Sequence, residues 1–126
     1  MILADLRDWL LGEGFAGDIA VKPDGVDDGH PYWMIFAPST EVDGGIEDVD
    51  GDRHPLVQIK SVGNSTTQAL ALHGRMHDRA KAYGAPGVQL VSVENESGPH
   101  RDDDRWPGPH AFYVDLFVRI RTTPTP

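Results

Sequence analysis

The chain has 126 residues, which suits one domain with one hydrophobic core. Its formal net charge is −9, so it lacks the excess of Lys and Arg that binding a phosphate backbone requires. It contains no cysteine, which excludes disulfide bonds and thiolate metal sites, and no apolar run approaches the length of a membrane span. We therefore expect an ordinary globular domain with no membrane segment and no sequence-specific DNA binding.

The N-terminal third of the chain predicts one helix and two strands. Ile2–Leu11 places apolar side chains on one helical face. Asp18–Lys22 predicts a short strand, and turn residues follow it. Tyr32–Ala37 predicts a second strand that is apolar on both faces, so we expect it near the centre of a sheet with cover on both sides. Trp9 and Trp33 are expected in the core.

The segment of about 41–53 is rich in Asp, Glu and Gly, and it predicts a mobile, solvated loop. Asp48, Asp50 and Asp52 alternate as the first ligands of a calcium loop do. However, Gly51 falls between the last two, which is not the EF-hand spacing, and no flanking helices are predicted. We therefore expect no metal site in this loop.

A strand, a tight turn and a helix form the best-defined part of the sequence. Leu56–Val62 predicts the strand, and Ser65 with Gln68 fits a capping box in which each contacts the backbone N–H of the other. Gly84 stands where a C-cap glycine belongs. One apolar stripe follows the helix and should pack on the sheet; it consists of Ala69, Leu72, Met76, Ala80 and Tyr83.

The C-terminal part predicts two more strands. Val88–Val93 is the first, a long loop of about 94–110 follows, and Ala111–Arg121 is the second. The last strand alternates clearly, with Phe112, Val114, Leu116, Val118 and Ile120 on its core face. Residues 122–126 predict a disordered tail. The sequence thus predicts a single α+β domain over 1–121: a two-layer sandwich in the order α-β-β-β-α-β-β, with helices packed on a mixed or antiparallel sheet.

Two pairs of residues have spacings that occur in catalytic or metal sites. His73 and His77 lie four apart on one helix, a spacing that can bind zinc, but no Glu follows the first His and no third ligand is evident; two surface histidines are expected instead. Gln58 and Lys60 share one face of a strand before a helix, which is similar to the core of PD-(D/E)xK nucleases. Because Gln58 replaces the carboxylate that would hold Mg²⁺, we expect no enzyme activity, no cofactor and no metal.

Four residues have the character of contact residues. Tyr113, Phe117 and Arg119 share the face of the last strand opposite its core face, and these residue types are enriched in buried protein contacts. Trp106 lies in a predicted loop, where an aromatic side chain is more often a contact than a core residue. We expect these four residues at a subunit interface, although a second helix of the same chain covering the strand residues is an open alternative.

Several short motifs resemble tail terminator (tail-completion) proteins of long-tailed, non-contractile bacteriophages. The strand Leu56–Gly63 ends in S-V-G, and the next helix carries Gln68-Ala69 and, after Arg75, the pair Asp78-Arg79. A helix like Ile2–Leu11 begins those proteins, and a strand like Phe112–Ile120 closes them. The resemblance covers most of the chain in layout, while the two long predicted loops go beyond it.

The resemblance implies a virion structural protein that is assembled in the host cytoplasm and located at the head–tail junction. Such proteins form a hexameric ring, end growth of the tail tube and join the tail to the head-completion or connector protein. DNA passes through the ring, so we expect lumen-facing carboxylates among Asp48, Asp50, Asp52, Asp102, Asp103 and Asp104. The alternatives are another head–tail connector or neck adaptor protein and, less favoured, the nuclease.

Overall fold

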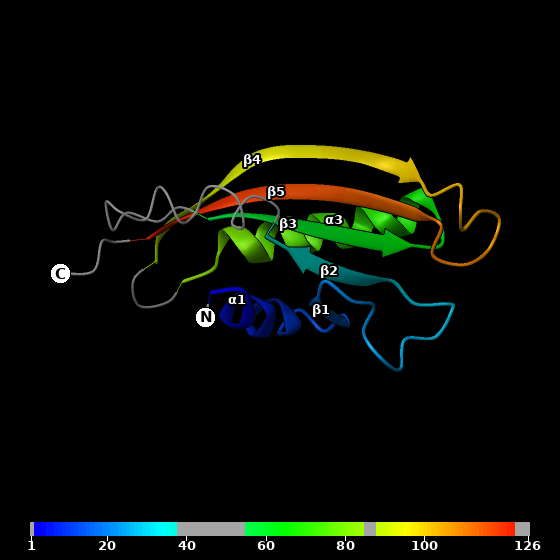
Figure 1. Ribbon diagram of the computed structural model, residues 1–126, viewed down its shortest axis with the longest axis horizontal. Coiled ribbons are helices and arrows are strands. Elements are labelled where there is room, and N and C mark those ends of the chain that lie inside the picture. The colour runs from blue at the N-terminus through cyan, green and yellow to red at the C-terminus, as the bar shows by residue number, and fades with distance from the viewer. Residues whose placement is uncertain (1, 38–54, 85–87, 123–126) are drawn as a thin grey trace.

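The structure is a computed structural model that describes residues 2–37, 55–84 and 88–122. Two helices pack on a five-stranded mixed sheet, which confirms the predicted α+β class and element order (Figure 1). The elements in chain order are α1 (Ile2–Leu11), β1 (Gly17–Ile19), β2 (Tyr32–Phe36), β3 (Leu56–Gly63), α3 (Thr66–Lys81), β4 (Val88–Arg101) and β5 (Phe112–Thr122).

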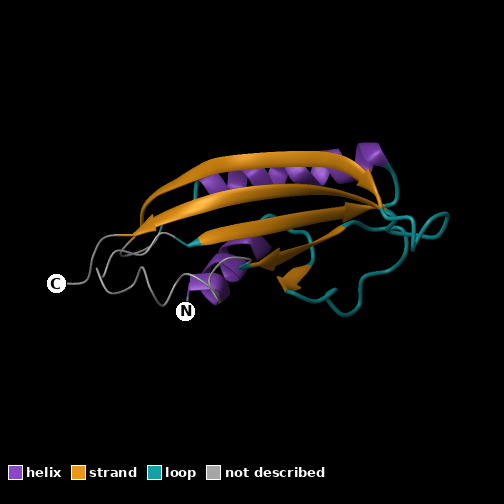
Figure 2. Ribbon diagram, turned by 45° about the horizontal axis from the view of Figure 1, so that its top comes forward, coloured by secondary structure: helices purple, strands orange, loops and turns teal. Residues whose placement is uncertain are grey.

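The sheet has the strand order β1-β2-β3-β5-β4. β1 pairs with β2 in parallel, and the other three pairings are antiparallel. β4 and β5 form a long hairpin, and β5 also pairs with β3 along its length. Figure 2 shows the longer helix on the far side of the long strands, so one face of the sheet meets the helices.

The core lies between that face and the two helices. Leu72 and Met76 of α3 are buried there, as the apolar stripe predicts, together with Leu6 and Leu10 of α1. Alternate residues of the strands meet them, because side chains alternate between the two faces of a sheet. The buried strand residues are Trp33, Ile35, Val57, Ile59, Val91, Leu116, Val118 and Ile120.

α1 is fixed to α3 by reciprocal contacts between Trp9 and Arg79. The Trp9 indole N–H donates to the Arg79 carbonyl at 2.7 Å, and Arg79 Nε donates to the Trp9 carbonyl at 2.9 Å. The Arg79 guanidinium also lies 3.9 Å from the centroid of the Trp9 ring. Trp9 is therefore only half buried and connects the two helices, although it was predicted in the core. Trp33 is fully buried, as predicted.

The capping box at the start of α3 is present in a modified form. The Ser65 hydroxyl accepts from the Gln68 backbone N–H at 3.1 Å, as predicted. The Gln68 side chain, however, accepts from the N–H of Asn64 at 2.6 Å instead of that of Ser65. At the other end, the prediction of a Gly84 cap is wrong: the helix ends at Lys81, and Ala82 caps it in a right-handed conformation.

The first strand is shorter than the predicted Asp18–Lys22 and lies earlier in the chain. Ala20 has a φ of 59°, in the left-handed region, which ends the strand at Ile19. Gly17 is the first residue of the strand. A Cβ added to it would lie only 1.9 Å from Cε2 of Trp33. The close approach of the buried indole to this backbone therefore requires glycine.

The prediction of a loop over 94–110 is wrong for its first half, because β4 continues to Arg101. Three register shifts interrupt its pairing with β5, between Val88 and Leu90, Val93 and Asn95, and Ser97 and His100. Gly98, with a φ of 122°, lies in the third of these irregularities. A bulged strand loses the simple alternation by which strands are recognised in a sequence.

The second strand occupies an interior position in the sheet as expected, but its two faces are not equally buried. Trp33 and Ile35 face the helices and are buried, whereas Met34 and Phe36 on the opposite face are only half buried. In the described part of the chain, no helix covers this second face of the sheet. The apolar residues of β2 therefore contribute to a surface as well as to the core.

Candidate functional site

The face of the sheet that no described helix covers is a continuous surface built from three strands. Its side chains are half buried in the isolated chain, and cross-strand pairing places Met34 opposite Lys60 and Gln58 opposite Phe117. We call this surface the open face; its residues are Met34, Phe36, Gln58, Lys60, Tyr113, Asp115, Phe117 and Arg119. Its Tyr, Phe, Met and Arg side chains are of the types enriched in protein contact surfaces, whereas Lys60 and Asp115 are not.

Two polar contacts lie within the open face. The Gln58 amide donates to the Asp115 carboxylate at 3.0 Å, and the Lys60 ammonium lies 4.1 Å from the centroid of the Tyr113 ring. Lys60 therefore contacts the aromatic ring of Tyr113, and the Asp115 carboxylate accepts a hydrogen bond from the Gln58 amide. This arrangement gives no support to a nuclease centre, in which Lys would steady a water held by metal-bound carboxylates.

The structure brings together three of the four predicted interface residues. Tyr113, Phe117 and Arg119 follow one another along the open face of β5. Arg119 Nε lies 3.5 Å from the carboxylate of Glu94 on β4, and the Tyr113 ring lies 5.1 Å from that of His100. In the described residues no second helix of the chain covers them, which was the alternative considered from the sequence.

Trp106 lies apart from these three residues, in the loop that joins β4 to β5. We call residues 101–110 the hairpin tip; in Figure 1 it projects beyond the ends of the long strands. The Trp106 side chain is 48% exposed, although its ring packs edge to face on Phe112 with centroids 5.5 Å apart. The Arg101 guanidinium lies 5.0 Å from the indole centroid.

The predicted lumen-facing carboxylates fall into two sets. Asp48, Asp50 and Asp52, with the calcium-like spacing, lie outside the described residues. The other set lies in the hairpin tip, where Asp102 pairs with Arg105 at 3.4 Å and Asp103 pairs with Arg101 at 2.9 Å. Two arginines thus offset most of the charge of the three tip carboxylates, which the count of acidic residues alone did not indicate.

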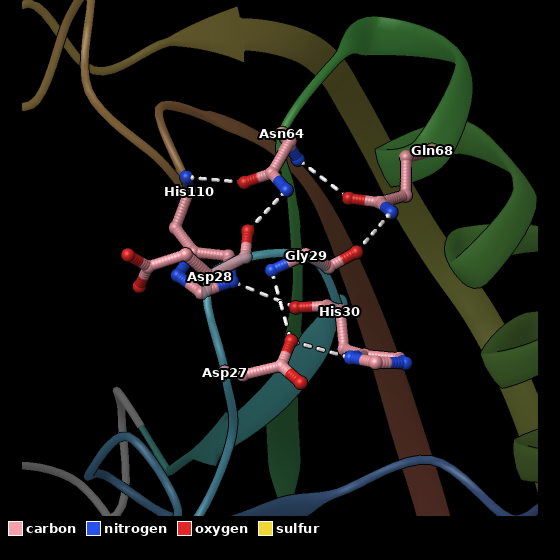
Figure 3. A network of polar contacts seen from close by, with 7 residues as sticks. All are labelled: Asp27, Asp28, Gly29, His30, Asn64, Gln68 and His110. Carbon is pink, nitrogen blue, oxygen red and sulfur yellow. Dashed lines mark hydrogen bonds and ion pairs between the residues drawn. The ribbon is translucent and has the colours of Figure 1, made fainter.

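A polar network holds the base of the hairpin tip, and the sequence did not reveal it. Asn64 lies at its centre in Figure 3: its side-chain oxygen accepts from the His110 N–H at 2.8 Å, and its amide donates to the Asp28 carbonyl. Gln68 donates to the Gly29 carbonyl at 3.2 Å. The buried His110 ring bonds the His30 carbonyl through Nε2 at 2.7 Å, so this nitrogen carries the proton.

The network also includes an Asx-type turn in the β1–β2 loop. The Asp27 carboxylate accepts from the Gly29 N–H at 2.9 Å and contacts Nδ1 of His30. The hydrogen bond from His30 and that from Gly29 hold the pKa of Asp27 below its ordinary value. The turn orders the carbonyls that Asn64 and Gln68 bind. The sequence predicts only a tight turn at the position of Asn64, and nothing around His110 marks that residue.

The prediction that His73 and His77 are both surface residues is wrong for His73. His73 is buried, and its Nε2 lies 2.7 Å from the Glu96 carboxylate on β4. Its Nδ1 has no hydrogen-bond partner among the described residues. His77 contacts Asp78 at 3.0 Å, and the two imidazole rings are 6.4 Å apart. The extension of β4, which brings Glu96 beside α3, explains the difference.

In the part of the chain that the structure describes, no three His, Asp or Glu side chains gather closely enough to hold a metal ion. None of the helices described is long and apolar enough to cross a membrane. Comparison with known protein families gave no match, and comparison with curated proteins gave no significant relative.

Proposed function

We propose that this protein is a structural component of a phage virion that forms a ring at the head-proximal end of the tail tube, in the manner of a tail terminator. The open face is the observation that carries the proposal. It places Tyr113, Phe117 and Arg119 together on a sheet surface that no described helix covers. Residues of these types stabilise protein interfaces when a partner buries them.

The edges of the sheet favour association through its face. β1 has only three residues, and its Asp18 is paired with Arg7 of α1 at 3.3 Å. β4 is long, but its register shifts and Pro99, which lacks an N–H, interrupt the regular row of groups that another strand would need. A subunit contact through the open face of one copy and a different surface of the next is heterologous, and such contacts form a ring when the rotation between successive copies closes.

The net charge of −9 per chain suits a ring through which DNA passes. Carboxylates near a channel repel phosphates and leave no adhesive site for the DNA. Under this proposal the ring contacts the tail tube protein on one side and the head-completion or connector protein on the other. It needs no cofactor and performs no chemical reaction.

A neighbouring connector or neck adaptor protein of the same junction is the second candidate, because the open face serves a ring at either position. The nuclease is less favoured: Lys60 contacts Tyr113, and Gln58 hydrogen-bonds to Asp115. Addition of the purified protein to tails that lack it separates the first two candidates. A terminator caps free tails and limits tube length, whereas a connector adaptor binds to heads without limiting tube growth.

Phe117→Asp tests the role of the open face. It places a charge in the middle of that surface, so a folded monomer without rings is expected, because burying an unpaired carboxylate is costly. The control is Leu70→Asp, since Leu70 is 45% exposed on α3, away from the open face. Light scattering and negative-stain microscopy, alone and with tail tubes, give the readout. Rings formed normally by Phe117→Asp would exclude the open face as the interface.

A further inference from the structure

We infer that the surface that meets the open face within the ring is the hairpin tip of the neighbouring copy, with Trp106 packed against Phe117 and Asp104 paired with Lys60. The inference deepens the proposed function, on which it rests, because it names the second surface of the heterologous contact. It places Trp106 on the opposite side of that contact from Phe117. It also assigns Asp104 to the subunit contact, whereas the sequence predicts a lumen-facing carboxylate there.

The tip presents a large aromatic side chain that its own subunit leaves uncovered. Among the described Trp, Tyr and Phe residues, only Trp106 is exposed, with 48% of its surface accessible. Its indole contacts Phe112 and the Arg101 guanidinium at 5.5 and 5.0 Å between centres, which fixes its orientation. The tip projects beyond the ends of the long strands (Figure 1), so it can reach another copy. Trp and Arg are enriched among the side chains that dominate protein–protein binding energy.

The open face offers an apolar surface that such a side chain can cover. Cross-strand pairing arranges the centre of this face as two rows of three side chains: Met34, Lys60 and Asp115, then Phe36, Gln58 and Phe117. All six are half buried, and no described helix lies over them. Apolar side chains therefore lie on both sides of Lys60 and Gln58, within reach of one indole.

The tip carries one carboxylate that is available to a partner. Its two arginines neutralise the other two, since Asp102 pairs with Arg105 at 3.4 Å and Asp103 pairs with Arg101 at 2.9 Å. The Asp104 side chain makes no hydrogen bond or ion pair with the described residues; only its backbone N–H is bound, to Asp102. This carboxylate lies close in sequence to the exposed indole.

Lys60 is the corresponding cation of the open face. The other charged residues of this face have polar partners: Arg119 pairs with Glu94 at 3.5 Å, and Asp115 accepts an amide hydrogen bond at 3.0 Å. The Lys60 ammonium lies over the Tyr113 ring and makes no hydrogen bond or ion pair with the described residues. Because an ammonium has three N–H donors, it can bind a carboxylate and keep its contact with the ring.

The spacing of the proposed contacts agrees on the two surfaces. Lys60 and Phe117 are diagonal neighbours on adjacent strands, because Lys60 pairs with Asp115. Side chains at such positions are about 7–8 Å apart. Asp104 and Trp106 are two residues apart, which spans at most about 7 Å of backbone. One tip can therefore place its indole on Phe117 and its carboxylate beside Lys60 at the same time.

The tip is already ordered before it binds. The N–H groups of Arg105 and Trp106 both donate to the Asp102 carbonyl at 3.0 Å, and the Asp102 N–H donates to the Ala111 carbonyl at 2.7 Å. The Asn64 network fixes its base to the sheet (Figure 3). A loop held in this way loses little conformational entropy on association.

The acidity of the whole chain does not decide this contact. Two copies with a net charge of −9 repel at long range. However, salt screens exposed charges beyond about 8 Å at physiological ionic strength, so the groups that meet in the contact determine its strength. The carboxylate of Asp104 and the ammonium of Lys60 are opposite in sign there.

The chain contains no cysteine, so introduced thiols can test the contact directly. Lys60→Cys combined with Asp104→Cys should give, with a short bismaleimide, a series of covalently linked oligomers up to the closed ring. Each single-cysteine variant should give none, because a heterologous contact places the two positions on different copies. The control is Asp104→Cys combined with Leu70→Cys, since Leu70 is exposed on α3, away from the open face. It should give no series of linked oligomers.

An exchange of charges provides the second test. Asp104→Lys and Lys60→Asp should each raise the protein concentration needed for half-assembly by about two- to fivefold, as expected for one exposed ion pair. The double variant should restore assembly, because it reverses the pair. Asp104→Lys also makes each subunit less acidic, so weaker assembly of this variant cannot result from the overall charge. Light scattering gives the readout.

Trp106→Ala provides the third test, with Leu70→Ala as the similarly exposed control. Trp106→Ala should raise the concentration for half-assembly at least about tenfold, a typical loss for a central aromatic contact, and Leu70→Ala should not change it. An unchanged circular dichroism spectrum shows that each variant is folded.

The outcomes separate this inference from the proposed function. Normal rings of the double-cysteine variant without cross-linking, or a charge exchange that fails to restore assembly, would overturn the inference and leave the proposed ring intact. Normal assembly of Trp106→Ala would do the same. Wild-type protein that forms no rings, either alone or with tail tubes, would overturn the proposed function together with the inference.

Discussion

The side-chain oxygen of Asn64 accepts a hydrogen bond from the backbone N–H of His110, 46 residues later in the sequence, at 2.8 Å. Asn64→Ala removes this bond and the one to the Asp28 carbonyl. Groups left unpaired in this way should lower the free energy of unfolding by about 1–3 kcal/mol. Urea denaturation measures the loss. The control is Asn95→Ala, because the Asn95 side chain on β4 is exposed. It should change stability by less than about 0.5 kcal/mol.

Leu72 is buried between α3 and the sheet, with 1% of its surface exposed. Leu72→Ala should lower the free energy of unfolding by about 2–5 kcal/mol, because it removes apolar contacts and leaves a cavity. Thermal and urea denaturation give the measurement. The control, Leu70→Ala, lies two residues away on the exposed side of the same helix, so a similar loss there would contradict the assigned orientation.

Two glycine substitutions should have effects of opposite sign. Gly17→Ala places a Cβ 1.9 Å from Cε2 of the buried Trp33, so the indole or the backbone must move, and a loss of about 1–3 kcal/mol or more is expected. Gly74 lies inside α3, and apart from its neighbours in the helix no atom of the described residues lies within 4 Å of an added Cβ. Gly74→Ala should therefore stabilise the protein by about 0.5–1 kcal/mol. Melting temperatures that move in the same direction would contradict this pair.

Burial raises the pKa of Tyr32 above its ordinary value of 10.0. A raised pKa in the folded state favours the neutral phenol there, so its contribution to stability is complete below pH 10.0 and is lost as pH rises through the folded-state value. Stability should fall above about pH 10, and Tyr32→Phe should make that fall less steep. Urea midpoints across this range and the absorbance of tyrosinate test it. Equal slopes in both proteins would contradict the assignment.

The sequence predicted the fold wherever one strong local pattern governs an element. The apolar stripe with Leu72 and Met76 and the alternation around Leu116 and Val118 both correspond to buried faces. The errors arose where a local pattern was broken by a distant contact or an irregularity. β4 was cut short because its bulges interrupt the alternation, and β1 was displaced because Ala20 adopts a left-handed conformation.

The candidate site was predictable only in part, for the same reason. The shared face of Tyr113, Phe117 and Arg119 follows from the period of two along β5, and the pairing confirms it. The polar network around Asn64 depends on its hydrogen bond with His110, 46 positions away, and no local sequence pattern indicates such a contact. The burial of His73 likewise depends on Glu96, whose strand was assigned to a loop.

The position of β5 has a consequence for the order of events during synthesis. It is the last described strand in the sequence, yet it lies between β3 and β4 in the sheet. Until β5 leaves the ribosome, β3 and β4 lack the strand that joins them, so the five-stranded sheet can form only after Phe112–Thr122 has been synthesised. β5 also carries Tyr113, Phe117 and Arg119, so a truncated chain lacks both a finished sheet and the proposed contact surface. Under the proposed function, an assembling ring therefore accepts only subunits that contain β5.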